Sequence, residues 1–164
     1  MYDLLYQDLA WAEAYNDRDL RGMAKNLSEY KKLVGNRAAQ IYGDYLPPGM
    51  MGASVSMSVN PQTCGIEGLE EAKKLVEKRR LPDVIVEAVL DHELRHAQQC
   101  QQEGEAFRDT ENLENRARFE LDAHIVGIKR LMKYVEEHCE QSGNLYNLDT
   151  ARQRFERLEA ANRP

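Results

Sequence analysis

Residues 84–102 read VIVEAVLDHELRHAQQCQQ and contain the most informative pattern in the chain. The stretch follows Pro82-Asp83, which suits a helix start, and its apolar residues recur at steps of three and four, as is typical of one face of an α-helix: Val86, Val89, Leu90, Leu94 and Ala97. The opposite, polar face carries Glu87, Asp91, Arg95 and Gln99. On such a helix His92 and His96 lie about one turn apart, roughly 6 Å along the axis, with their imidazoles on one face. The pattern predicts a helix that buries one side and presents two histidines to a cleft.

His92, Glu93 and His96 together form a His-Glu-x-x-His motif. Two neutral imidazoles on one helix face can bind a single Zn²⁺, and Glu93 then stands beside the metal, where a general base is required. The alternative is an ordinary pair of partly buried histidines next to a solvated glutamate. Only four histidines occur in the chain, and two of them fall in this frame, so the zinc site is the favoured interpretation.

A catalytic zinc site needs a third protein ligand, which must come from elsewhere in the chain. The longer motif with a later glycine and a third histidine does not occur, because Gln99 and Gln102 occupy those two positions. The leading candidate is Glu120, on a helix predicted over about residues 110–139. Further candidates, in falling order of preference, are His124 and then the acidic residues Asp122, Glu114, Glu103 and Glu105.

These residues make the chain resemble the small zincin metallopeptidases of the gluzincin group. In that group a glutamate ligand follows His-Glu-x-x-His on a later helix, often within a Glu-x-x-Ala-Asp signature, and residues 120–124 here read Glu-Leu-Asp-Ala-His. His124 stands where the family has an aspartate that supports the metal-binding histidines by hydrogen bonding. Its role is therefore open between such support, direct metal binding and neither.

The resemblance covers about residues 53–133 and implies an α+β, mostly α, zincin-like fold. The active-site helix and the glutamate-bearing helix should pack beside a small β-sheet or edge strand. Residues 50–59 read MMGASVSMSV, and this alternation predicts a half-buried strand. In zincins such a strand forms the edge of the cleft and pairs with an extended peptide, so the resemblance implies that role here.

The rest of the chain is predicted to complete a single domain over residues 1–164. A helical N-terminal part covers residues 1–46, a catalytic core covers about 50–140, and a C-terminal helix covers about 148–162. Within the N-terminal part, Asn16-Asp17 separates a first helix from a second one that runs through about residue 34. Gly35 either interrupts this second helix or lets it run on to about Tyr42.

Composition and charge exclude several function classes. Hydrophobic residues make up 42% of the chain and charged residues 30%, as in ordinary soluble globular proteins. The net charge of −6 argues against a general binder of nucleic acid or anionic membranes. We find no apolar run of membrane-span length, and the acidic, aromatic N-terminus does not read as a secretory signal. The expected location is the cytoplasm, or the outside of the cell by a non-classical route if the chain is an effector domain.

Three cysteines, without any Cys-x-x-Cys spacing, do not form a zinc ribbon. Cys100 lies one turn after His96 on the predicted helix, so its thiolate is a distant candidate for the metal. The favoured interpretation is a buried or idle thiol. A Cys64–Cys100 disulfide is the alternative for an oxidising compartment.

The sequence thus predicts a zinc metallopeptidase that acts on a peptide or protein substrate. His92, His96 and Glu120 hold Zn²⁺, and Glu93 is the general base. One alternative is a cell-wall peptide amidase or a toxin domain with the same zinc chemistry, which would have an inhibitor or immunity protein as partner. A second is a non-catalytic zinc-binding scaffold, against which the presence of Glu93 argues. Weak candidates for stabilising an oxyanion are Tyr134, His138 and Arg130.

Overall fold

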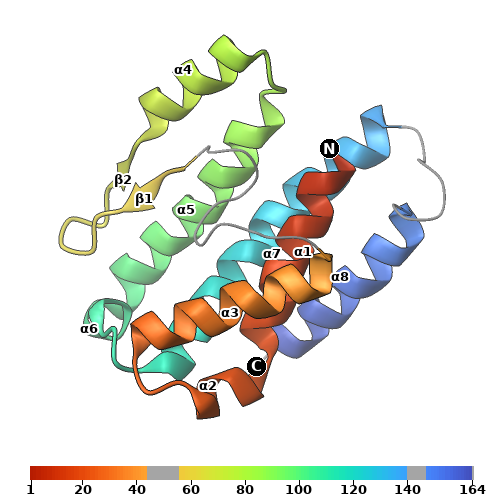
Figure 1. The fold of residues 1–164 in the computed structure, drawn as a ribbon. Coiled ribbons are helices and arrows are strands. Elements are labelled where there is room, and N and C mark those ends of the chain that lie inside the picture. The colour runs from red at the N-terminus through yellow and green to blue at the C-terminus, as the bar shows by residue number, and fades with distance from the viewer. Residues whose placement is uncertain (44–55, 140–146, 164) are drawn as a thin grey trace.

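The computed structural model describes residues 1–43, 56–139 and 147–163. These residues form eight helices and two short strands, so the chain is mostly α with a small β component, as the sequence predicts. In chain order the elements are α1 (Tyr2–Asn16), α2 (Arg18–Met23), α3 (Leu27–Tyr42), β1 (Ser58–Val59), β2 (Ile66–Glu67), α4 (Leu69–Arg79), α5 (Val84–Glu103), α6 (Glu105–Arg108), α7 (Leu113–His138) and α8 (Leu148–Asn162) (Figure 1).

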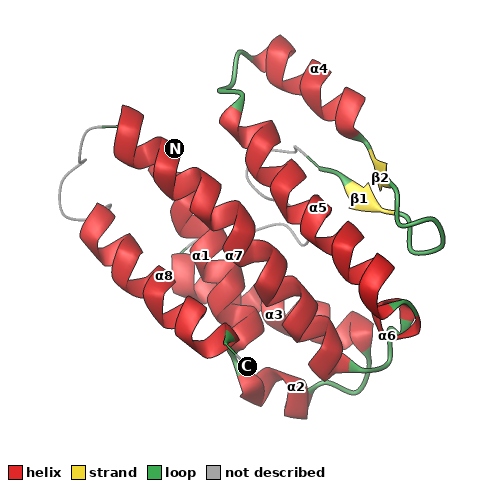
Figure 2. Cartoon of the chain, turned by 180° about the vertical axis from the view of Figure 1, so that it is seen from behind, coloured by secondary structure: helices red, strands yellow, loops and turns green. Residues whose placement is uncertain are grey.

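The long helix α7 is the centre of the fold. It packs against α5 and also against α1 and α8, while α3 packs on α1 (Figure 1). Apolar side chains fill the space between these helices, among them the fully buried Leu5 and Leu9 of α1 and Ile128 and Val135 of α7. The hairpin of β1 and β2 and the helix α4 lie together beside α5, away from α8 (Figure 2).

The predicted helix over residues 84–102 is confirmed as α5, and Val86, Val89 and Ala97 of its predicted apolar side are buried. Two other residues of the helix are not where the spacing predicted them. Leu94, placed by its spacing on the apolar side, is 45% exposed, whereas Gln99, placed on the solvated side, is 3% exposed. The reason is that α7 packs along the side of α5 that carries His92 and His96, and both histidines are buried there. The histidines therefore lie on the packed face of the helix.

The predicted separation of the first two helices at Asn16-Asp17 is confirmed, because α1 ends at Asn16 and the Asp17 side chain caps α2. The second predicted helix, by contrast, is divided into α2 and α3. The helix predicted through residue 34 is broken before Asn26, whose side chain caps α3 by accepting a hydrogen bond from the Glu29 amide. Gly35 does not interrupt α3, which continues to Tyr42. A Cβ at residue 35 would lie 3.5 Å from the Trp11 ring, an ordinary van der Waals distance, so the packing of the indole does not require glycine here.

Only the end of the predicted strand over residues 50–59 falls within the described residues. Ser58 and Val59 pair antiparallel with Glu67 and Ile66, and residues 60–65 connect the two strands. Residues 50–55 of the predicted strand lie outside the described residues, and residues 56 and 57 are described but do not belong to β1. The predicted C-terminal helix over about residues 148–162 is confirmed as α8, and Asn147 caps it by accepting hydrogen bonds from the amides of Asp149 and Thr150.

A disulfide joins Cys64, in the turn between β1 and β2, to Cys100 of α5, with 5.6 Å between the Cα atoms. The interpretation of Cys100 as an idle thiol is therefore wrong, and its sulfur does not serve a metal. Cys139 is free and half-buried. The disulfide fixes the hairpin against the helix that carries the histidines.

We expect this disulfide to contribute about 2–4 kcal/mol to the free energy of unfolding, because it closes a loop between residues 36 apart in sequence. Reductant should then lower the Tm of the wild type by roughly 5–15 °C. Calorimetry with and without dithiothreitol measures this shift. A Cys139→Ala variant should keep the full response to reductant, and a Cys64→Ala/Cys100→Ala variant should lose it. An unchanged wild-type Tm in reductant would contradict the prediction.

Among the described residues, no helix combines the length and the apolar composition needed to cross a bilayer.

Candidate metal centre

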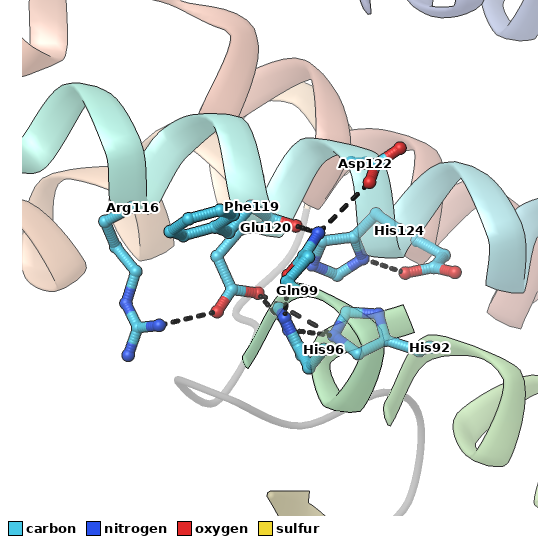
Figure 3. Close-up of polar contacts among 9 residues, drawn as sticks. His92, His96, Gln99, Arg116, Phe119, Glu120, Asp122 and His124 are labelled. Carbon is cyan, nitrogen blue, oxygen red and sulfur yellow. Dashed lines mark hydrogen bonds and ion pairs between the residues drawn. The ribbon is translucent and has the colours of Figure 1, made fainter. Parts of the chain in front are cut away.

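Two helices bring three candidate ligands together. Nε2 of His92 and Nε2 of His96, both on α5, lie 3.1 Å apart. Oε2 of Glu120, on α7, lies 3.7 Å from Nε2 of His92 and 3.4 Å from Nε2 of His96 (Figure 3). The one-turn spacing of the histidines is local to α5, but the approach of Glu120 depends on the packing of α7 against α5. The structure thus brings together the three residues predicted as ligands.

The separations of these donor atoms fit one small cation. Ligands at about 2.0–2.1 Å from a tetrahedral zinc ion lie roughly 3.3–3.4 Å from one another. The three measured separations, from 3.1 to 3.7 Å, bracket this value. Two imidazole nitrogens and a carboxylate oxygen are also a donor set that suits zinc. The residues therefore fit the ion that the sequence implies.

The charges in the centre suit a cation. Burial, together with the neighbouring His124, lowers the pKa of His92 to about 4, so this imidazole is neutral. Burial alone would raise the pKa of Glu120, but the facing His96 and His92 hold it well below its ordinary value, so the carboxylate is ionised. Burial opposes a charge on His96, yet Glu120 raises its pKa. A metal ion would take the place of the proton that Glu120 attracts to this site.

Gln99 fixes the tautomer of His96. Its amide nitrogen lies 3.1 Å from both the Phe119 carbonyl oxygen and Oδ2 of Asp122, and it donates to both. Its amide oxygen therefore faces Nδ1 of His96 at 2.8 Å and accepts a hydrogen bond from it (Figure 3). With the proton on Nδ1, the lone pair of Nε2 is free for a metal.

His124 forms a buried ion pair with Asp8 of α1. Nδ1 of His124 and Oδ1 of Asp8 lie 2.6 Å apart, and Asp8 is only 1% exposed. Burial opposes a charge on His124, but Asp8 raises its pKa above the ordinary value. The ring of His124 packs edge-on against His92, with 4.6 Å between the centroids. His124 thus supports the centre from behind His92 and is not one of the three clustered donors.

Glu93 lies on the wall of the same pocket, next to the donors. Burial raises the pKa of its carboxyl group to about 7, although the nearby His96 acts in the opposite direction. The pocket has a volume of about 490 Å³ and contains all three donors, Glu93 and His124. Helices α1, α3, α5, α6 and α7 and the strand β1 all contribute to its walls.

The other candidates from the sequence have different partners. Asp122 binds Arg95 and Gln99, Glu103 binds Arg118, and Glu114 binds Arg21. Arg130 pairs with Asp91 and Glu87, and Tyr134 packs on His138. Within the described part of the chain, none of the three candidates for stabilising an oxyanion, Arg130, Tyr134 and His138, lines the pocket.

Sequence reasoning missed Asp8 and Gln99. Asp8 is a lone carboxylate between residues of the apolar stripe of α1, and this unusual position is a sequence signal for a buried partner. Gln99 gave no such signal, because its spacing placed it on the polar side of α5. Only the packing of α7 buries it.

Comparison of the chain with protein-family models, with curated proteins and with solved structures finds no significant match. Its function must therefore be inferred from the residues of this pocket.

Proposed function

We propose that the protein is a zinc-dependent hydrolase of peptide bonds with a zincin-like arrangement of its two central helices. His92, His96 and Glu120 are the metal ligands and Glu93 is the general base. The observation that carries the proposal is the set of donor separations, 3.1, 3.4 and 3.7 Å, which match the edges of a zinc coordination tetrahedron.

Each group in the pocket has a distinct part in this reaction. Bound by its three ligands, zinc would act as a Lewis acid toward the scissile carbonyl and lower the pKa of a coordinated water toward about 7. Glu93 accepts the proton of the attacking water on its carboxylate and passes it to the leaving amine. Gln99 and the pair of Asp8 and His124 hold the imidazoles in place.

A catalytic site is favoured over a purely structural one. Structural zinc sites are closed by four protein ligands, whereas catalytic sites have three and keep one position open. Three donors cluster among the described residues, and they face a pocket large enough for part of a peptide. Glu93 on the pocket wall has no evident use in a scaffold.

The strand β1 supports a peptide as the substrate. Ser58 and Val59 line the pocket, so a strand lies at the rim of the metal centre. An extended peptide can add its backbone hydrogen bonds to the edge of such a strand. The resemblance to zincins implies such a role for a strand at this point in the chain.

The test combines metal analysis with turnover. The wild type, purified without added metal, should contain about one zinc per chain by elemental analysis. It should cleave an unfolded protein substrate or a cell-wall stem peptide, lose this activity with 1,10-phenanthroline and regain it with zinc. Bound zinc without cleavage of either substrate would favour the scaffold. A chain that binds no zinc when zinc is supplied would rule out the proposal.

A further inference from the structure

Three basic residues from neighbouring segments line the pocket. Lys31 of α3, Arg108 of α6 and Arg116 of α7 all line it, and we call this group the basic corner. The three residues come from segments far apart in the sequence, and the beginnings of α3 and α7 meet near α6 at this end of the molecule (Figure 1). In a chain with 28 acidic and 22 basic residues, such a gathering is not expected from composition.

The positive charge of the basic corner is largely uncompensated. Lys31 and Arg108 are exposed, and the described part of the chain offers neither of them an acidic partner within 4.0 Å. Other arginines of the chain do have acidic partners: Arg118 pairs with Glu103, and Arg130 pairs with Asp91. Lys31 and Arg108, which have no acidic partner among the described residues, are therefore available to a ligand.

The acidic groups of the pocket already have roles. Asp8 pairs with His124, Oε2 of Glu120 faces the two histidines, and Glu93 is the proposed general base. Nη1 of Arg116 lies 3.8 Å from the other oxygen of Glu120, so this guanidinium reaches from the basic corner to the metal centre (Figure 3). A ligand that contacts the basic corner would thus lie directly beside the proposed scissile bond.

Exposed lysines and arginines commonly contact only solvent. The residues of the basic corner differ because they line a pocket. Charges of one sign on the walls of a cleft focus the field and attract ligands of opposite charge. Guanidinium groups also bind carboxylates through paired, charge-assisted hydrogen bonds. An acidic ligand gains from both effects here, and a neutral one from neither.

We infer that the basic corner binds a carboxylate of the substrate, next to the bond that is cleaved. This inference rests on the proposed function and defines its substrate class as peptides with a carboxylate close to the scissile bond. The carboxylate belongs either to the C-terminus of the peptide or to an aspartate or glutamate side chain. The first source corresponds to an exopeptidase and the second to an endopeptidase specific for acidic sites.

Binding can be followed without turnover, because the only tryptophan, Trp11, lines the same pocket. We would titrate the full chain, supplied with zinc and carrying Glu93→Gln to prevent cleavage, with acetylated tetrapeptides and record Trp11 fluorescence. Three peptides differ only at their last residue, which is glutamine amide, glutamine with a free carboxylate, or glutamate amide. At least one of the two carboxylate peptides should bind about tenfold or more tightly than glutamine amide, as charge-assisted hydrogen bonds typically provide. The tighter of the two identifies the source.

Two double variants test whether the preference for a carboxylate depends on the basic corner. Lys31→Ala/Arg108→Ala should lose most of the preference for the carboxylate while it keeps its zinc, because both side chains are exposed and neither touches a proposed ligand. Lys32→Ala/Lys133→Ala removes the same charge from exposed positions outside the pocket and should keep the preference. Arg116 is left intact, since its loss would disturb Glu120.

Equal binding of all three peptides to the protein with an intact basic corner would overturn the inference. So would a preference that survives in Lys31→Ala/Arg108→Ala, or one that both double variants lose to the same extent. These outcomes are separate from failure of the proposed function, which is judged by zinc content and cleavage of the wild type.

Discussion

Replacing Glu93 by glutamine is expected to lower kcat/KM for peptide hydrolysis by about 10²–10⁴-fold, the range that general base catalysis contributes. Glutamine has nearly the same shape as glutamate but cannot accept the proton of the attacking water. Glu93 is not one of the three clustered donors, so the variant should still contain about one zinc per chain. Steady-state kinetics and elemental analysis of the same preparation measure both quantities.

Glu87→Gln is the matched control for this variant. Glu87 lies on the same helix, is exposed and makes only a 3.8 Å ion pair with Arg130. Its replacement should change neither the activity nor the zinc content. If Glu93→Gln retained the wild-type rate, Glu93 would not be the base, and a hydrolytic function of this pocket would need another proton acceptor.

Loss of a metal ligand is the second large effect. His96→Ala and Glu120→Ala should each lower zinc affinity by more than the 10–100-fold that loss of a supporting hydrogen bond typically costs. Proteins purified without added metal should therefore contain far less than one zinc per chain, against about one for the wild type. Because a bound ligand stabilises the folded state by mass action, chelator should lower the Tm of the wild type but not of these variants.

Two variants of α7 serve as controls for Glu120→Ala. Glu114→Ala removes an acidic side chain that is 71% exposed and should leave the zinc content unchanged. His124→Ala tests the residue behind His92 and should reduce the affinity less than Glu120→Ala does, because His124 is not one of the clustered donors. If Glu120→Ala kept its zinc and His124→Ala lost it, the gluzincin-like ligand set would be wrong and His124 would be the third ligand.

The pair of Asp8 and His124 shows what stands at the position where the chain departs from the gluzincin signature that it resembles. Gluzincins have an aspartate four residues after the glutamate ligand, whereas this chain has His124, whose Nδ1 pairs with Asp8 of α1. In the proposed site the supporting carboxylate thus acts through an intervening imidazole, and α1 contributes to it. The proposed metal centre would then depend on the packing of α1 on α7.

The sequence by itself determined the features that depend on neighbouring residues. The apolar periodicity predicted α5 and α7, and the four-residue spacing of His92 and His96 placed both imidazoles on one side of a helix. These predictions succeed because the hydrogen bonds of an α-helix join residues four apart. A short stretch of chain is therefore enough to show the spacing of its apolar residues. Glu120 could be named from its signature, but its distance from the histidines could not be predicted.

Only the tertiary structure decided which faces of the helices are buried and which distant residues meet. Leu94 is exposed and Gln99 is buried because α7 packs along the histidine side of α5. Asp8 meets His124 across 116 residues of chain, and the Cys64–Cys100 disulfide, against the favoured interpretation, closes across 36. Such contacts depend on how whole helices pack, which is settled by the sum of many weak apolar contacts and is not encoded in the spacing of any single stretch.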